Sequence, residues 1–300
     1  MTQSRTRPDP VYKSAKLRIG KLLTSLEAEA QPAATAASPD AAVLTSLPPH
    51  LVHRLRVCTK RLRALLQLYR PVASKATIKA VERPIKALAD SWSGQRDAVA
   101  QYETLCHLVE VFQQSNDQDM QPLMRCFEVR LQQVAVKAEP LEPIAALERI
   151  QQLWKDSLKG KKAPDYESGV EFAYRKARKL AYEAESSDDD EVYHWCRKWT
   201  KYYLYQLQMI VAEPRPRDKA LIKQLKQLGE LLGGFHDRCV LEQALNGLLA
   251  KKQDEALEQA ALLMLSWLME QKRVDKSQCQ GLFESVFARP HNPFKLARLS

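Results

Sequence analysis

The segment HRLRVCTKRLR, residues 53–63, has a shorter counterpart in HWCRKWTK, residues 194–201. Both fit the pattern His-x-x-Arg-x-x-x-Lys, and the second copy follows the first by 141 residues. A basic pattern that occurs twice in one chain indicates an internal duplication and a surface that binds an anion.

The composition is typical of a helical protein. The chain has 300 residues, 45% of them hydrophobic and 27% charged, which is enough for one large domain or two small ones. It has only nine glycines, it is rich in good helix formers, and period-two runs of Val, Ile and Thr are hard to find. We therefore predict an all-α fold. The net charge of +10 favours polyanionic partners, namely nucleic acid, an anionic membrane or polyphosphate.

Helical stretches and breaks follow one order in both halves of the chain: basic helix, loop, histidine helix, break, helix, Gly-x-x-Asp, helix. The Gly-x-x-Asp segments begin at Gly94 and Gly234, and a helix is expected to start at Asp97 and again at Asp237. We predict a single domain with half-repeats at about 10–158 and 165–288, and a basic C-terminal tail at 289–300. The expected helices cover about 11–29, 49–70, 73–89, 97–114, 118–137, 141–158, 166–185, 190–212 and 218–232, with another from 237 and a last pair ending near 288.

The first histidine helix has a cationic face and an apolar face. At 100° per residue, His53, Arg56, Lys60 and Arg63 fall within an arc of about 80°, opposite Leu55, Leu62 and Leu66. The second helix repeats this division, with Trp199 and Tyr203 on its apolar face. These faces supply the primary predicted contacts, which are His53, Arg56, Lys60, Arg63, His194, Arg197, Lys198 and Lys201.

The residue types on this face suit phosphate oxygens. Arginine offers a planar fork of donors, lysine adds a mobile charge, and a nearby anion favours protonated histidine. Asp97 and Asp237 are interpreted as N-caps or as partners that orient an arginine, and we favour the cap. His236, which precedes Asp237, could border the site. The secondary predicted contacts are Lys13, Lys16, Arg61, Arg175, Arg178, Lys179 and Tyr205.

Motifs for catalysis, metals or membranes do not stand out. The chain lacks the phosphate-binding loop, the dinucleotide fingerprint, the zinc-protease motif and the nucleophile elbow, so we assign no catalytic residue, metal or cofactor. The acidic run at 188–191 could chelate a divalent ion, but we favour a solvated capping run. Six scattered cysteines indicate reduced, buried thiols. The first residues lack the apolar core of a signal peptide, and the most apolar stretch, 257–269, is too short to span a bilayer. We therefore expect a cytoplasmic protein.

These motifs resemble the CHAD family, the conserved histidine α-helical domain. The resemblance rests on both histidine motifs, the Gly-x-x-Asp segments and the basic run at 174–178, and it covers about residues 10–285. It implies two helical bundles related by pseudo-twofold symmetry, with basic residues converging on a central groove or pore. The family is associated with inorganic polyphosphate and with polyphosphate granules. The second copy departs from the first at Tyr202 and Leu204, which replace Arg61 and Arg63, so we expect the first copy to bind more strongly.

The resulting prediction is non-enzymatic binding of inorganic polyphosphate, with targeting to granules. One alternative is a nucleic-acid-binding protein, for which Trp195 and Tyr202 are marginal stacking candidates. Another is an enzyme acting on phosphorylated metabolites or short polyphosphate, with His53 or His194 as acid. A third is an adaptor that recruits granule-associated proteins. The sequence does not decide whether the two cationic faces meet.

Overall fold

The structure is a computed structural model that describes residues 9–34, 47–92, 94–134, 141–158, 166–210, 216–251 and 254–294. Every regular element within these ranges is helical, which confirms the predicted all-α class. The elements are α1 (Pro10–Ala34), α2 (Pro49–Leu66), the 3-10 turn η1 (Gln67–Tyr69), α3 (Lys75–Ser91), α4 (Gly94–Gln113), α5 (Gln121–Val134), α6 (Pro143–Leu158), α7 (Tyr166–Glu185), α8 (Asp190–Ile210), α9 (Pro216–Leu249) and α10 (Glu255–Phe287).

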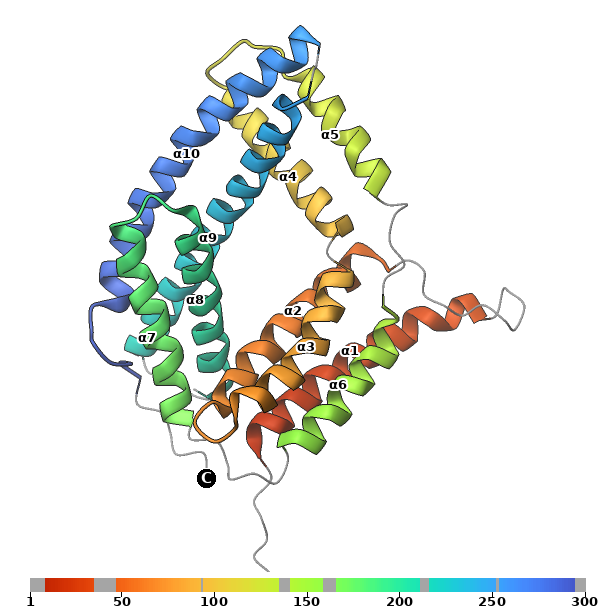
Figure 1. Cartoon of the computed structure of the whole chain (residues 1–300), viewed down its shortest axis with the longest axis vertical. Helices are drawn as coiled ribbons and strands as arrows, with labels where there is room; N and C mark the ends of the chain where they lie inside the picture. Colours follow the sequence, from red (N-terminus) through yellow and green to blue (C-terminus); the bar gives the residue numbers. More distant parts are fainter. Residues whose placement is uncertain are drawn as a thin grey trace, which may run out of the picture.

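The helices form three packed groups arranged as a triangle (Figure 1). The first group is α1, α2, α3 and α6. The second contains α7 and α8, with the first part of α9 and the last part of α10. The third contains α4 and α5, with the opposite ends of α9 and α10. Because α9 and α10 each run through two groups, they fix the third group to the second.

Two hydrophobic cores fill these groups. The smaller core lies in the third group and takes residues from α4, α5, α9 and α10. The larger core extends through the first and second groups, which meet where α2 packs on α8 and where α7 packs on η1. Gly169 permits that contact, since a Cβ there would lie 3.0 Å from the Leu68 Cα. Among the free thiols, those of Cys58, Cys196 and Cys279 are buried.

Asp9 joins the start of α1 to η1 and α7. Its Oδ1 accepts a hydrogen bond from the Val11 N–H at 2.9 Å, the contact of a helix N-cap. The hydroxyls of Tyr69 and Tyr166 also donate to this carboxylate. Burial raises the pKa of both tyrosines, so both remain protonated donors. One carboxylate thus ties together three segments that are distant in sequence.

Two of the helix breaks predicted in the second half are wrong. Helix α9 continues through Gly233 and Gly234 to Leu249, so it neither ends near 232 nor restarts at Asp237. Helix α10 is likewise one helix where a pair was expected. Two glycines inside a helix cost about 1 kcal/mol each relative to alanine. Burial of Leu228, Leu232 and Phe235 on one side of α9 offsets that cost.

The described part of the predicted basic tail is packed against α7 and α8. The Tyr174 hydroxyl donates to the Arg289 carbonyl at 2.6 Å, and Glu171 accepts from the Asn292 N–H at 2.8 Å. Phe294 is buried in the larger core. The end of the predicted tail, 295–300, lies outside the described residues. In the described part of the chain, no helix combines the length and hydropathy needed to cross a membrane.

Candidate functional site

The two histidine helices pack against each other. Helices α2 and α8 converge toward their C-terminal ends (Figure 1), where the Gln206 side-chain amide donates to the Ala64 carbonyl at 2.9 Å. One turn earlier, the Arg61 guanidinium lies over the Tyr205 ring, 5.5 Å from its centroid. The faces that carry the two motifs therefore meet, which the sequence left undecided.

Four basic side chains gather where α2 and α8 approach, and we call them the cationic cluster. Arg56 and Lys60 come from α2, and Arg197 and Lys201 from α8. Burial, followed by repulsion from the other three, lowers the pKa of Lys60 to about 8. The Lys60 ammonium therefore lies where burial and neighbouring positive charges disfavour it. Such an arrangement is expected where a bound anion offsets the repulsion.

Helix α9 packs against the two cations of α8. A Cβ on Gly229 would lie 3.2 Å from the Lys201 Cε, a tight contact, whereas a Cβ on Gly233 would make an ordinary contact with the Arg197 Nε at 3.7 Å. Burial, and then the charge of Arg197, lowers the pKa of Lys201. The Nε of Arg197 is buried without a hydrogen-bond partner in the described residues, so it retains donor capacity for a ligand. Gly229 thus leaves space for Lys201, and the glycines of α9 do not break the helix.

A histidine pair borders the cationic cluster. The Nδ1 atoms of His194 on α8 and His236 on α9 are 3.3 Å apart. Burial, then the charges of Arg197, His194 and Lys60, lowers the pKa of His236 to about 4. Burial also lowers the pKa of His194, although Glu191 opposes the shift. Both rings are therefore neutral near pH 7 in the anion-free protein.

Asp237 is a partner of the cations and not a helix cap. It lies inside α9, so the favoured N-cap prediction is wrong for this residue. Its carboxylate opposes the lowering of the pKa of Arg197 and of Lys60, which supports the alternative prediction of an orienting partner. Asp97 is the fourth residue of α4 and does not precede the helix, so it is not an N-cap either. The side chain of Asp97 lies outside the described residues.

Two predicted primary contacts lie on another flank of the α2–α8 contact. The Arg63 Nε forms an ion pair with Glu82 of α3 at 3.2 Å, so its charge is partly neutralised. Lys198 is near Arg63, and its Nζ lies 4.6 Å from the centroid of Trp195. Trp195 is 41% exposed and thus accessible. Tyr202, the other stacking candidate, is buried and cannot stack with a base. Tyr203 is buried, as predicted.

The remaining predicted contacts lie outside the cationic cluster, either exposed or paired with other groups of the protein. His53 is exposed at the open end of α2, and the side chains of Lys13, Lys16 and Lys179 are also exposed. Arg175 pairs with Glu171 at 2.7 Å, and the Arg178 Nε donates to the Phe287 carbonyl at 3.0 Å. These last two guanidiniums secure the C-terminal segment and the end of α10.

The sequence interpretation did not include Arg18 of α1 among the predicted contacts, and it did not assign a role in the site to the α9 glycines. Arg18 is near Arg61, and burial followed by that neighbouring charge lowers its pKa. If the sequence had been interpreted as one continuous α9, the two glycines would have been placed beside the site. Residues 229, 233, 236 and 237 share one face of that helix.

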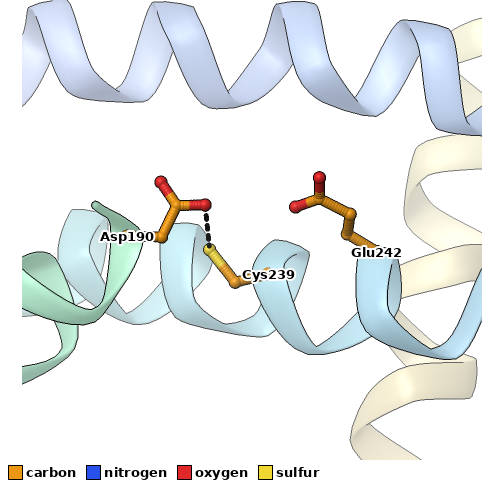
Figure 2. Close-up of side chains that lie close together, drawn as sticks. All are labelled: Asp190, Cys239 and Glu242. Carbon is orange, nitrogen blue, oxygen red and sulfur yellow. Dashed lines mark hydrogen bonds between the residues drawn. The ribbon is translucent and has the colours of Figure 1, made fainter. Parts of the chain in front are cut away.

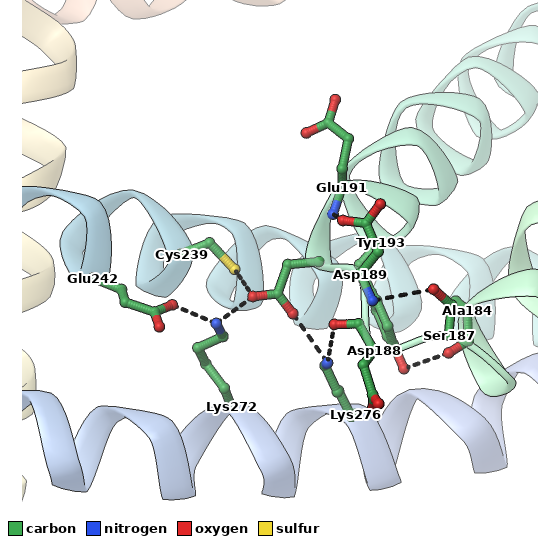
Figure 3. A network of polar contacts seen from close by, with 11 residues as sticks. Ala184, Ser187, Asp188, Asp189, Glu191, Tyr193, Cys239, Glu242, Lys272 and Lys276 are labelled. Atoms are coloured by element: carbon green, nitrogen blue, oxygen red, sulfur yellow. Dashed lines mark hydrogen bonds and ion pairs between the residues drawn. The ribbon is translucent and has the colours of Figure 1, made fainter. Parts of the chain in front are cut away.

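A separate cluster of potential metal ligands lies between α8, α9 and α10. Ligand atoms of Asp190, Cys239 and Glu242 lie within 4.8 Å of one another (Figure 2). Figure 3 shows that the Lys272 ammonium lies between the two carboxylates and pairs with both, while Lys276 binds Asp190 at 3.0 Å. Burial raises the pKa of the Cys239 thiol to about 12, which opposes metal binding by thiolate. The group is best explained as an ion-pair network joining α8, α9 and α10.

The acidic run at 188–191 contains a helix cap. The Asp189 Oδ1 accepts from the Glu191 N–H at 2.9 Å, directly before α8, as the capping prediction required. Asp190, however, is paired with Lys272 and Lys276 and is not simply solvated.

A surface cavity of about 480 Å³ lies in the third helix group. Its only charged lining residue is Glu270, so it does not suit an anion. The lining residues are Phe112, Asn116, Gln118, Gln259, Leu263, Ser266, Trp267 and Glu270.

Comparisons with known proteins agree with the helical architecture. The family model described as the CHAD domain matches residues 14–246. The crystal structure of the CHAD domain from the plant Ricinus communis is similar, with a TM-score of 0.58 and 18% identity over 94% of this chain and 93% of that one. PptA from Streptomyces chartreusis has a TM-score of 0.65 at 13% identity, over 94% of this chain and 100% of that one. No curated protein matches the chain significantly. The match to the family model, over more than two thirds of the sequence, means that the chain belongs to the CHAD domain family.

Proposed function

We propose that this protein binds inorganic polyphosphate, without catalysis, in a basic groove between α2 and α8. The observation that carries the proposal is the cationic cluster, in which Lys60, Arg197 and Lys201 all have lowered pKa values because they are buried beside like charges. An anion placed among these groups would relieve that repulsion. The association of the CHAD family with polyphosphate supports this choice of anion.

A polymer suits the arrangement better than one phosphate does. The cationic cluster runs along α2 from Arg56 to Lys60 and along α8 from Arg197 to Lys201. With a rise of about 1.5 Å per residue, each row extends about 6 Å, or one helical turn. Successive phosphates of one chain can contact successive turns, and every added contact makes the affinity more dependent on salt.

The non-enzymatic part of the proposal rests on the surroundings of the histidines. His194 and His236 face each other and a set of cations. Lys60, Arg197 and Lys198 near the rings are donors for phosphate oxygens, and Glu191 is a carboxylate that acts on His194. We assign Glu191 no role in activating water at a bound phosphate. Targeting of the protein to polyphosphate granules would follow from binding alone.

Nucleic-acid binding is the second candidate, and Trp195 is the observation that favours it. An exposed indole beside Lys198 could stack with a base while the lysine contacts a phosphate. Its ring already carries the Lys198 ammonium on one face, and Tyr202 is buried, so stacking would involve a single aromatic residue.

The test compares ligands in one set of tubes. Binding of long-chain polyphosphate, duplex DNA, single-stranded RNA and orthophosphate is measured at several salt concentrations, and released phosphate is assayed. We expect polyphosphate to bind most tightly, with no phosphate released. If DNA or RNA binds more tightly than polyphosphate, the proposal of polyphosphate binding is wrong and nucleic-acid binding is favoured. Release of phosphate that is lost in His194→Ala would establish an enzyme instead.

A further inference from the structure

The structure assigns a second anion subsite to Arg18 and Arg61, at the junction of α1, α2 and α8, and we propose that it holds phosphates of the same chain beyond the cationic cluster. This inference rests on the proposed function. It adds that long polyphosphate chains should make contacts that short ones cannot. It concerns Arg18, which no sequence motif identified.

The guanidiniums of Arg18 and Arg61 are neighbours, and no described carboxylate neutralises their charges. The Nε atoms of Arg18 and Arg61 are both buried without a hydrogen-bond partner in the described ranges, and neither side chain forms an ion pair there. Their common neighbour, Cys58, supplies no negative charge, because burial raises the pKa of its thiol to about 11. Two buried donors of like charge, with no acceptor, are the arrangement expected of a site that receives an anion.

Tyr205 connects this pair to the cationic cluster. Its ring lies under Arg61, at 5.5 Å from the guanidinium carbon to the centroid, which orients the fork of donors. Its phenol also interacts electrostatically with Arg197, so the same side chain lies next to both groups. A chain leaving Arg197 therefore passes Tyr205 before it reaches Arg61 and Arg18.

The arrangement predicts discrimination by length. Lys60 and Arg61 are consecutive residues whose side chains leave α2 about 100° apart, so their heads are separated by roughly the width of a helix, about 10 Å. Pyrophosphate can occupy the cationic cluster alone. A long chain can occupy both groups and gains the additional contacts.

The experiment measures binding of pyrophosphate and of long-chain polyphosphate to the full chain and to Arg18→Gln, Arg61→Gln and Lys21→Gln. Lys21 is exposed one turn after Arg18 on α1 and provides a control of equal charge. We expect Arg18→Gln and Arg61→Gln each to weaken long-chain binding about three- to tenfold and to reduce the slope of log K against log salt by about 0.7. Pyrophosphate binding should be unchanged, and Lys21→Gln should resemble the parent.

The outcomes separate the two proposals. If the parent binds long-chain polyphosphate and Arg18→Gln binds it as Lys21→Gln does, the second subsite is wrong and the proposed function stands. If both subsite variants weaken pyrophosphate as much as the long chain, there is one site and the length requirement is wrong. If the parent binds no polyphosphate at low salt, the proposed function fails and this inference fails with it.

Discussion

The Nδ1 atoms of His194 and His236 lie 3.3 Å apart, across the contact between α8 and α9. A hydrogen bond of this kind requires one ring to donate and the other to accept, so the pair shares one proton at these atoms. Lys60, Arg197 and Lys198 add positive charge around the rings, and Glu191 and Asp237 add the nearby negative charge. Protonating the pair is therefore unfavourable until an anion is present.

Polyphosphate binding should take up protons. In the free protein the pKa of His236 is about 4, below its ordinary value of 6.5, and that of His194 is lowered too. A bound polyanion raises both pKa values, so affinity should increase as the pH falls from 7 to 5. Calorimetry in two buffers of different ionisation enthalpy measures the uptake directly. It should decrease in His236→Gln and persist in His107→Gln, whose parent histidine is exposed on α4. Equal uptake in both variants would contradict this role of the pair.

Without an anion, the same histidines should make the fold sensitive to acid. The folded state binds fewer protons than the unfolded state between about pH 4 and 6.5, because the folded pKa of His236 is the lower one. Stability should therefore fall as the pH falls through this window. Thermal unfolding at pH 5 and pH 7 tests this, and His236→Gln should narrow the difference in Tm. If the Tm difference between pH 5 and pH 7 is the same in His236→Gln as in the parent, groups other than His236 cause the acid sensitivity.

The α9 glycines offer a test that separates stability from binding. Gly229→Ala and Gly247→Ala should each gain up to about 1 kcal/mol of helix stability. Only the first displaces a ligand-binding side chain, since a Cβ at 229 meets Lys201, whereas a Cβ at 247 has nothing within 4 Å. Urea unfolding and polyphosphate titration should thus show two stabilised proteins, of which only Gly229→Ala binds several-fold more weakly. Equal binding by both variants would mean that Lys201 is not a contact.

The Lys272 network should contribute stability and not binding. Burial alone would raise the pKa of Asp190, but the ammonium groups of Lys272 and Lys276 bring it below its ordinary value. Lys272→Met leaves Asp190 and Glu242 facing each other and should cost about 3 kcal/mol in urea unfolding. Arg273→Met, on the exposed side of α10, should leave urea unfolding nearly unchanged. A Lys272→Met protein as stable as Arg273→Met would contradict the network.

Local periodicity was sufficient to predict which faces of α2 and α8 carry charge. Arg56, Lys60, Arg197 and Lys201 were identified because a 3.6-residue repeat fixes which side chains share a side of a helix. The continuity of α9 was not predictable in this way. Glycine disfavours a helix locally, and the compensating burial of Phe235 and its neighbours depends on helices distant in sequence.

Long-range pairing also limited the prediction of the site. Arg63 was expected to strengthen the first copy, but Glu82, 19 residues later, holds it in an ion pair. Arg178 was grouped with the anion contacts, but it binds a backbone carbonyl 109 residues away. Equivalent positions in a repeat predict equivalent faces, whereas the partners of each side chain depend on tertiary packing. His53 and His194 illustrate this, since one is exposed and the other is half-buried against His236.

The most direct test of the account compares two double variants that lose equal charge. Lys60→Gln/Arg197→Gln removes two members of the cationic cluster, whereas Lys21→Gln/Arg54→Gln removes two exposed cations. Binding of long-chain polyphosphate is titrated at several salt concentrations, with circular dichroism to verify helicity. We predict that the first variant loses about a hundredfold in affinity, and that its salt slope falls by about 0.7 for each cation, while the second binds nearly as the parent does. Equal affinity of the two variants would contradict the assignment of the site to the α2–α8 contact.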